Sequence, residues 1–153
     1  MEKTAASIER IVLSHWHRDH SGAITTLVKL LKAQRDKDST SVSSLDRNLV
    51  TVDLHPDRPI ARGIAPPPYQ KVIVRLPEDP SFEELEAAGA RLELSREGHT
   101  VGNGTVWVSG EIPRVTEFEA GLLGGMRWYE DGIGEDGKKS KGEWRAEPVS
   151  AHQ

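Results

Sequence analysis

The sequence of 153 residues contains no cysteine, which excludes disulfides, thiolate metal sites and a cysteine nucleophile. Hydrophobic residues make up only 36% of the chain and aromatic residues only 5%, both low for a compact domain. No run approaches the roughly 18 to 20 apolar residues of a membrane-spanning helix, and residues 1–10 contain no signal-peptide core. These absences predict a soluble, cytoplasmic protein that has no membrane partner.

The charge of the chain gives no indication of a polyanionic partner. The formal net charge is -4, and charged residues make up 29% of the chain. The sequence has no basic stripe of the kind that contacts a phosphate backbone. We therefore expect no nucleic-acid partner, and a small-molecule substrate is the class of partner that remains.

Hydrophobic periodicity predicts two helices. Residues 23–35 carry apolar side chains at the spacing of one helix face. These side chains are Ile24, Leu27, Val28 and Leu31. A short second helix is expected after Ser81 and Glu84, which have the spacing of a capping box, and Gly89 is expected to end it in the left-handed conformation.

Apolar and β-branched runs predict five strands between the turns. They cover residues 8–13, 49–54, 71–76, 91–95 and 105–109. The last two strands are expected to be joined by a Gly-containing turn around residues 98–104. This order of elements predicts a layered α/β or α+β domain over residues 1–128, whereas residues 129–153, rich in Gly and charge, are expected to be a polar, flexible loop or tail.

Three histidines and an aspartate occur within the hexad His15–His20, directly after the first predicted strand. Imidazole and carboxylate are the ligands that suit Zn²⁺ when thiolates are absent. In extended backbone, His15 and His17 point to the same side and can share one metal ion. Asp19 and His20 lie where the chain turns into the helix and can hold a second ion nearby. The alternative is a solvated turn in which Asp19 or Ser21 caps the helix.

The segment LSHWHRDHSGAI resembles the HxHxDH signature of the metallo-β-lactamase superfamily, which follows a strand and precedes a helix in that family. Three further segments resemble the branch of this superfamily described as dihydropteroate-synthase-like. They are HPDRPIARG at 55–63, EGHTVGNGTVWVSGEIPRVTEFE at 97–119 and GLLGGMRW at 121–128. The likeness spans about residues 11–128.

This resemblance implies an αββα sandwich that binds two zinc ions, or other divalent metal ions, and has a hydrolase-like or pterin-related transferase activity. His15 and His17 correspond to ligands of the first ion, and Asp19 and His20 correspond to ligands of the second. In many members the aspartate also accepts or shuttles a proton, which makes Asp19 the candidate catalytic residue. The same scaffold hosts many chemistries, so the substrate stays open.

The chain resembles only part of a family member. A complete member has several strands before the hexad and a third histidine for the first ion after the Gly-rich segment. The resemblance therefore implies a partial sandwich that lacks the first strands and the C-terminal part. Four ligands shared by two ions give each ion two protein bonds, fewer than a stable zinc site has. The alternative function is a catalytically inactive, truncated remnant that acts at most as a weak metal-binding or interaction fragment.

Five polar residues outside the hexad are candidate contacts for a substrate, which would then be anionic. They are His55, Arg58, Arg62, Glu111 and Arg114. A structural role stays open for each of them. The histidine either approaches the metal site or occupies a turn, and the two arginines near it either bind a phosphate or carboxylate or lie in solvent. Arg114 is either a substrate arm or the ion-pair partner of Glu111.

Three further residues are expected to have structural roles. His99 is expected in a hairpin turn, and Trp107 is expected to be buried or half-buried in a strand. Trp16, between two candidate ligands, is expected to wall the site or to pack beneath it.

Overall fold

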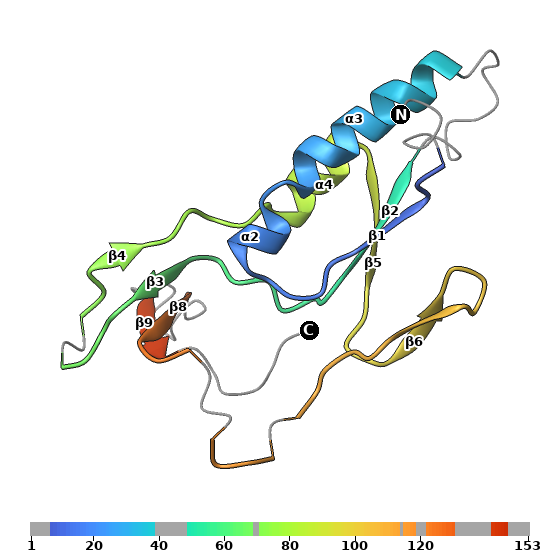
Figure 1. Ribbon diagram of the computed structural model, residues 1–153. Coiled ribbons are helices and arrows are strands. Elements are labelled where there is room, and N and C mark those ends of the chain that lie inside the picture. The colour runs from blue at the N-terminus through green and yellow to red at the C-terminus, as the bar shows by residue number, and fades with distance from the viewer. Residues whose placement is uncertain are drawn as a thin grey trace, which may run out of the picture. The chain divides into compact units, whose positions relative to one another are not determined.

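The structure, a computed structural model, describes residues 7–38, 49–68, 71–113, 115–118, 122–130 and 142–146 (Figure 1). The chain divides into two compact units. The first comprises Met1–Asp57, Pro80–Glu111 and His152–Gln153, and the second comprises Arg58–Asp79 and Ile112–Ala151. Helices and strands are mixed along the chain, in agreement with the predicted class of α and β structure.

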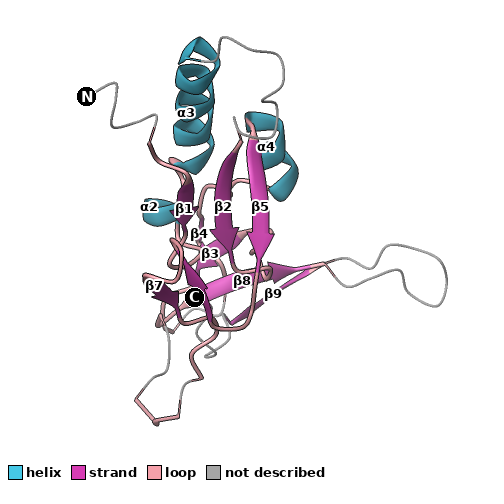
Figure 2. Cartoon of the chain, turned by 90° about the vertical axis from the view of Figure 1, so that its right-hand side faces the viewer, coloured by secondary structure: helices cyan, strands magenta, loops and turns pink. Residues whose placement is uncertain are grey.

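A parallel sheet forms the centre of the first unit. β1 (Arg10–Val12), β2 (Val50–Leu54) and β5 (Ala90–Leu94) pair in the order β1-β2-β5, and both pairings are parallel. Figure 2 shows the three strands side by side. All five residues of β2 are buried, because this strand has a neighbour on each edge. The strands predicted over 8–13, 49–54 and 91–95 are thus confirmed; the first two are shorter than predicted and the third begins and ends one residue earlier.

Two helices cover one face of this sheet. α3 (Ile24–Asp38) follows the single turn α2 (Arg18–Ser21), and α4 (Phe82–Ala88) precedes β5. Both pack into the same core as the central strand (Figure 1). The predicted face of α3 is buried except at its edge, where Leu27 is 37% exposed. Burying each large apolar side chain, such as Leu31, stabilises the fold by about 1.5–3 kcal/mol. Within the described residues, no helix is long and apolar enough to cross a membrane.

Both ends of α4 are determined by residues that the sequence identifies. The Ser81 hydroxyl accepts a hydrogen bond from the backbone N–H of Glu84 at 3.1 Å, and the Glu84 carboxylate accepts one from the backbone N–H of Ser81 at 2.8 Å. Gly89 ends the helix with φ of 105°, a conformation that favours glycine. The predicted capping box and left-handed helix end are both confirmed.

The hairpin that follows β5 differs from the prediction. β6 (His99–Val101) and β7 (Val106–Val108) pair with each other in antiparallel fashion, and their turn uses positive φ at residues 102–104. The prediction that the strands at 91–95 and 105–109 are joined by that turn was wrong, because β5 pairs with β2 instead. Trp107, expected to be at least half-buried, is 65% exposed, since the hairpin forms a separate two-stranded sheet.

An antiparallel sheet forms the second unit. β3 (Arg62–Ile64), β4 (Val74–Arg75), β8 (Gly125–Tyr129) and β9 (Glu143–Ala146) pair in the order β4-β3-β8-β9. The strand predicted over 71–76 is reduced to two residues. β9 lies in the segment expected to be a polar loop or tail, of which residues 131–141 and 147–153 lie outside the described residues. Trp144 faces Trp128 across β8 and β9, with ring centroids 5.4 Å apart, and this aromatic pair explains a strand that composition alone did not indicate.

The substitution Ser81→Ala is expected to destabilise the protein by about 1 kcal/mol, because the backbone N–H of Glu84 loses its acceptor at the start of α4. Ser81→Asp preserves an acceptor and is the matched control. Urea unfolding followed by circular dichroism measures both variants. Equal losses of stability in the two variants would contradict a role for the cap.

Candidate functional site

The hexad follows β1 and continues into α2, at the carboxyl end of the parallel sheet. Trp16 anchors it: the indole is buried, its N–H donates to the carbonyl of His55 at 2.8 Å, and its ring lies 6.0 Å from that of Phe82. The histidines on either side of it are half-buried. Trp16 therefore packs beneath the candidate ligands, as one of its two predicted roles required.

Three imidazole rings meet at this junction. The ring centroid of His15 lies 4.6 Å from that of His17 and 4.1 Å from that of His20. The hydroxyl of Ser14 lies 3.1 Å from Nδ1 of His15 and 3.3 Å from Nδ1 of His20. A hydroxyl has one hydrogen, so it donates to one ring and accepts from the other. Ser14, a residue that the sequence analysis overlooked, thus orients two of the candidate ligands.

Asp19 is the most exposed of the four candidate ligands. It lies in the first turn of α2, its side chain is 80% exposed, and one carboxylate oxygen is 3.5 Å from Nε2 of His20. The N-cap position of α2 is occupied by His17, without a side-chain hydrogen bond. The helix predicted over 23–35 begins as α3 at Ile24, after the additional turn α2, so the alternative in which Asp19 or Ser21 caps that helix stays a prediction.

The donor atoms of the hexad are of the types that zinc binds, but their positions in the structure do not form a metal site. Three imidazoles and one carboxylate are nitrogen and oxygen donors of the type that zinc binds. Among the residues that the structure describes, no three His, Asp or Glu side chains are arranged to hold a metal ion.

His55 and Glu111 come together, although 56 positions separate them in the sequence. The His55 side chain is 1% exposed, and its Nδ1 accepts a hydrogen bond from the backbone N–H of Asp57. Nε2 therefore carries the proton and donates to Glu111 at 2.8 Å. This hydrogen bond, followed by that from Arg96, lowers the pKa of Glu111. The pair ties the end of β2 to the segment after β7; Arg114 lies outside the described residues.

Arg58 and Arg62 belong to the second unit, whereas the hexad belongs to the first. Arg62 forms a buried ion pair with Asp79 at 2.8 Å, and Arg58 donates to the backbone carbonyl of the same aspartate at 2.5 Å. Both side chains of the ion pair are at most 4% exposed. These contacts give the two arginines a structural role within their own unit.

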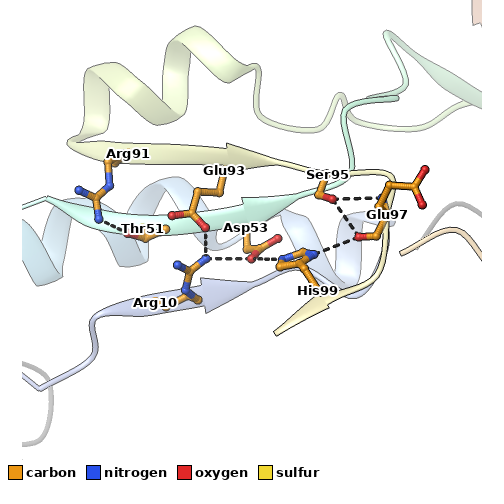
Figure 3. A network of polar contacts seen from close by, with 8 residues as sticks. All are labelled: Arg10, Thr51, Asp53, Arg91, Glu93, Ser95, Glu97 and His99. Carbon is orange, nitrogen blue, oxygen red and sulfur yellow. Dashed lines mark hydrogen bonds and ion pairs between the residues drawn. The ribbon is translucent and has the colours of Figure 1, made fainter. Parts of the chain in front are cut away.

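A network that the sequence analysis missed surrounds Asp53, at the carboxyl end of β2 (Figure 3). One carboxylate oxygen, Oδ2, accepts hydrogen bonds from Nη1 of Arg10 and from Nε2 of His99, each at 2.9 Å. Arg10 also contacts Glu93 at 2.5 Å, and this hydrogen bond lowers the pKa of Glu93. His99, expected in a turn, is the first residue of β6. A charged residue near the end of a strand rich in β-branched residues was the available signal.

His99 is held in its protonated form by two acceptors. Its Nδ1 faces the carbonyl of Glu97 at 3.1 Å while its Nε2 faces the Asp53 carboxylate, so both nitrogens act as donors. The hydrogen bond with Asp53, and next that with the Glu97 carbonyl, raises the pKa of His99 above its ordinary value of 6.5.

The carboxyl ends of the three parallel strands border a pocket of about 240 Å³. Ser14 of the hexad loop, Asp53 and His99 all line it, together with side chains of β7. Ligands of open α/β sheets bind at this end of the strands. Ser14, which contacts the rings of His15 and His20, and the buried carboxylate of Asp53 thus border one concave surface.

Comparison with protein-family models, with curated proteins and with solved structures found no match for this chain.

The stability that the Asp53–His99 pair provides is expected to depend on pH. Because the folded state raises the pKa of His99, this contribution is fully present below pH 6.5 and is lost as the pH rises through the raised value. Arg10 and Glu93 stay charged in this range. Urea unfolding between pH 5.5 and 9 should show a loss of stability in the wild type that is smaller in His99→Gln. Parallel pH profiles would exclude the pair as the cause.

Removal of the buried carboxylate in the second unit is expected to be strongly destabilising. Asp79→Ala leaves the guanidinium of Arg62 buried without its charge partner, at a cost of about 3–5 kcal/mol. The double variant Arg62→Met/Asp79→Leu removes both charges and should recover most of that loss. Thermal unfolding of both variants tests this; a double variant as unstable as Asp79→Ala would contradict the explanation.

Proposed function

We propose that this chain is a metal-dependent protein of the metallo-β-lactamase type that binds zinc through His15, His17, Asp19 and His20. The convergence of the three imidazole rings at the end of β1 carries the proposal. The proposed activity is hydrolysis of a small molecule; the pterin-related transfer that the resemblance implies is the second form of the same proposal. The αββα sandwich is the fold proposed to contain the parallel sheet and its two helices.

The surroundings of the three rings support metal binding. The Trp16 anchor fixes the backbone between His15 and His17. The hydroxyl of Ser14 contacts the rings of His15 and His20. Such hydrogen bonds to a ligand's second nitrogen orient histidines in metal sites. Because the side chains are already positioned, they lose less conformational entropy when a metal ion binds.

The residues of the chain have separate roles in the proposed reaction. A bound zinc ion supplies Lewis acidity. Ser14 holds the imidazoles of His15 and His20 through their Nδ1 atoms, which leaves the Nε2 atoms toward the outside of the pair. Asp19, with an exposed carboxylate beside His20, accepts a proton at a carboxylate oxygen, as a general base does.

The competing function is a protein that binds metal weakly and catalyses no reaction. One observation favours it: the hexad offers four donors, which complete one zinc site of three or four protein ligands but not two. Turnover by the zinc-loaded chain therefore separates the two functions.

Zinc binding can be measured on protein first treated with a chelator. Calorimetric titration should show at least one ion per chain, and His17→Ala should weaken binding by about tenfold or more because one donor is lost. Glu86→Gln, a change of an exposed carboxylate on α4, is the matched control and should bind like the wild type. Equal zinc affinity in His17→Ala and the wild type would refute the proposed site.

Activity is tested on the zinc-loaded chain with ester, lactone and phosphate-ester substrates. Turnover that Asp19→Ala reduces by about 100-fold or more, as expected for loss of a general base, would support the hydrolytic form. One bound zinc ion without turnover on any of these substrates would favour the competing function.

A further inference from the structure

The pocket at the end of the parallel sheet has a charged floor and apolar walls. β1, β2 and β5 reach it with their carboxyl ends, and the hairpin of β6 and β7 closes one side. Asp53 and His99 form the polar floor, whereas Leu54, Val106 and Trp107 contribute apolar surface. A concave, mainly apolar surface with a few convergent polar groups is typical of a small-molecule site.

One oxygen of the Asp53 carboxylate has no hydrogen-bond donor among the residues that the structure describes. Both Arg10 and His99 donate to Oδ2, and no residue of the described ranges donates to Oδ1. Figure 3 shows both dashed contacts converging on a single oxygen. The side chain is only 4% exposed, and a buried acceptor without a donor is unfavourable. A molecule in the pocket that presents a donor to Oδ1 would remove this deficit.

The charges around the floor favour a neutral donor. Asp53 and Glu93 are negative and Arg10 is positive; when His99 is protonated it adds a second positive charge, and the four charges then cancel. An ammonium group brought to Oδ1 would meet two cations already bound to the same carboxylate, and a phosphate or carboxylate would meet the carboxylate itself. A hydroxyl or an amide N–H donates without either repulsion.

The size of the pocket and its walls define the rest of the ligand. A volume of about 240 Å³ corresponds to roughly eight water molecules in the liquid, which is the size of one substituted six-membered ring. The exposed indole of Trp107 and the neighbouring valines offer surface against which such a ring can pack.

We propose that this pocket binds a neutral, single-ring compound whose hydroxyl or amide N–H donates to Oδ1 of Asp53 while the ring packs against Trp107. Binding of this compound uses none of the four proposed metal ligands. The site is therefore independent of the proposed zinc chemistry and stands even if the hexad binds no metal.

Two pairs of probe compounds test the proposal on the full chain labelled with ¹⁵N. Phenol is compared with anisole, and 2-pyridone with N-methyl-2-pyridone; within each pair only the first compound has a donor. Benzylamine tests a cationic donor. Titrations followed by the amide and indole signals should show that phenol or 2-pyridone binds about tenfold or more tightly than its partner and than benzylamine. Tighter binding of phenol would identify a hydroxyl as the preferred donor, and tighter binding of 2-pyridone would identify an amide N–H.

Two variants and one control locate the binding. Asp53→Asn should remove the preference for compounds with a donor. Because this change also weakens the contacts of Arg10 and His99, Trp107→Ala is a second test, at a side chain exposed enough to leave the fold intact; it should weaken binding of both donor compounds. Trp144→Phe, in the second unit, is the control and should bind like the wild type.

Three results would overturn the proposal. They are equal affinity for compounds with and without a donor, tightest binding of benzylamine, and no binding of any probe at millimolar concentration. All titrations are repeated with chelator and with zinc. If phenol binds equally well with chelator and with zinc, and the chain does not bind zinc, the proposed metal site is refuted and the pocket proposal stands.

Discussion

Asp53 lies on the central strand β2 with a side chain only 4% exposed, and burial of this carboxylate requires cations. An unpaired buried charge costs several kcal/mol. Arg10, on β1, and His99, on β6, supply the compensating charges through the same oxygen. The ion pairs that neutralise Asp53 therefore also join the edge strand and the hairpin to the sheet. On the opposite face, Val52 and Leu54 pack with the helices.

The same geometry brings the two proposed sites to one end of the sheet. Parallel strands place their carboxyl ends at a common edge, so the loop after β1 lies beside the end of β2. Ser14 illustrates the result, since it contacts the rings of His15 and His20 and also lines the pocket next to Asp53. The metal ligands and the pocket floor nonetheless use different residues, which separates the metal chemistry from the recognition of a ring compound.

Charged residues that look available in a sequence are often engaged in the fold. Arg62 pairs with Asp79 inside the second unit, and His55 is buried against Glu111. The sequence shows neither partner, because 17 and 56 positions separate these pairs. His99 shows the reverse case. It was expected to have a structural role in a turn, and it lies instead in a strand against Asp53, on the floor of the pocket.

Local features were predictable from the sequence because their causes are local. The hexad between a strand and a helix, the buried face of α3 and the capping box at Ser81 depend on residues within a few positions of one another. Strand pairing depends on distant residues. The sequence therefore did not reveal that β5 pairs with β2, that Trp107 stays exposed, or that Trp144 pairs with Trp128. The donor set of the hexad was determined by the sequence alone. The charges paired around Asp53, and the pocket beside them, were decided only by the tertiary structure, because a local sequence pattern does not show which distant side chains contact a buried carboxylate.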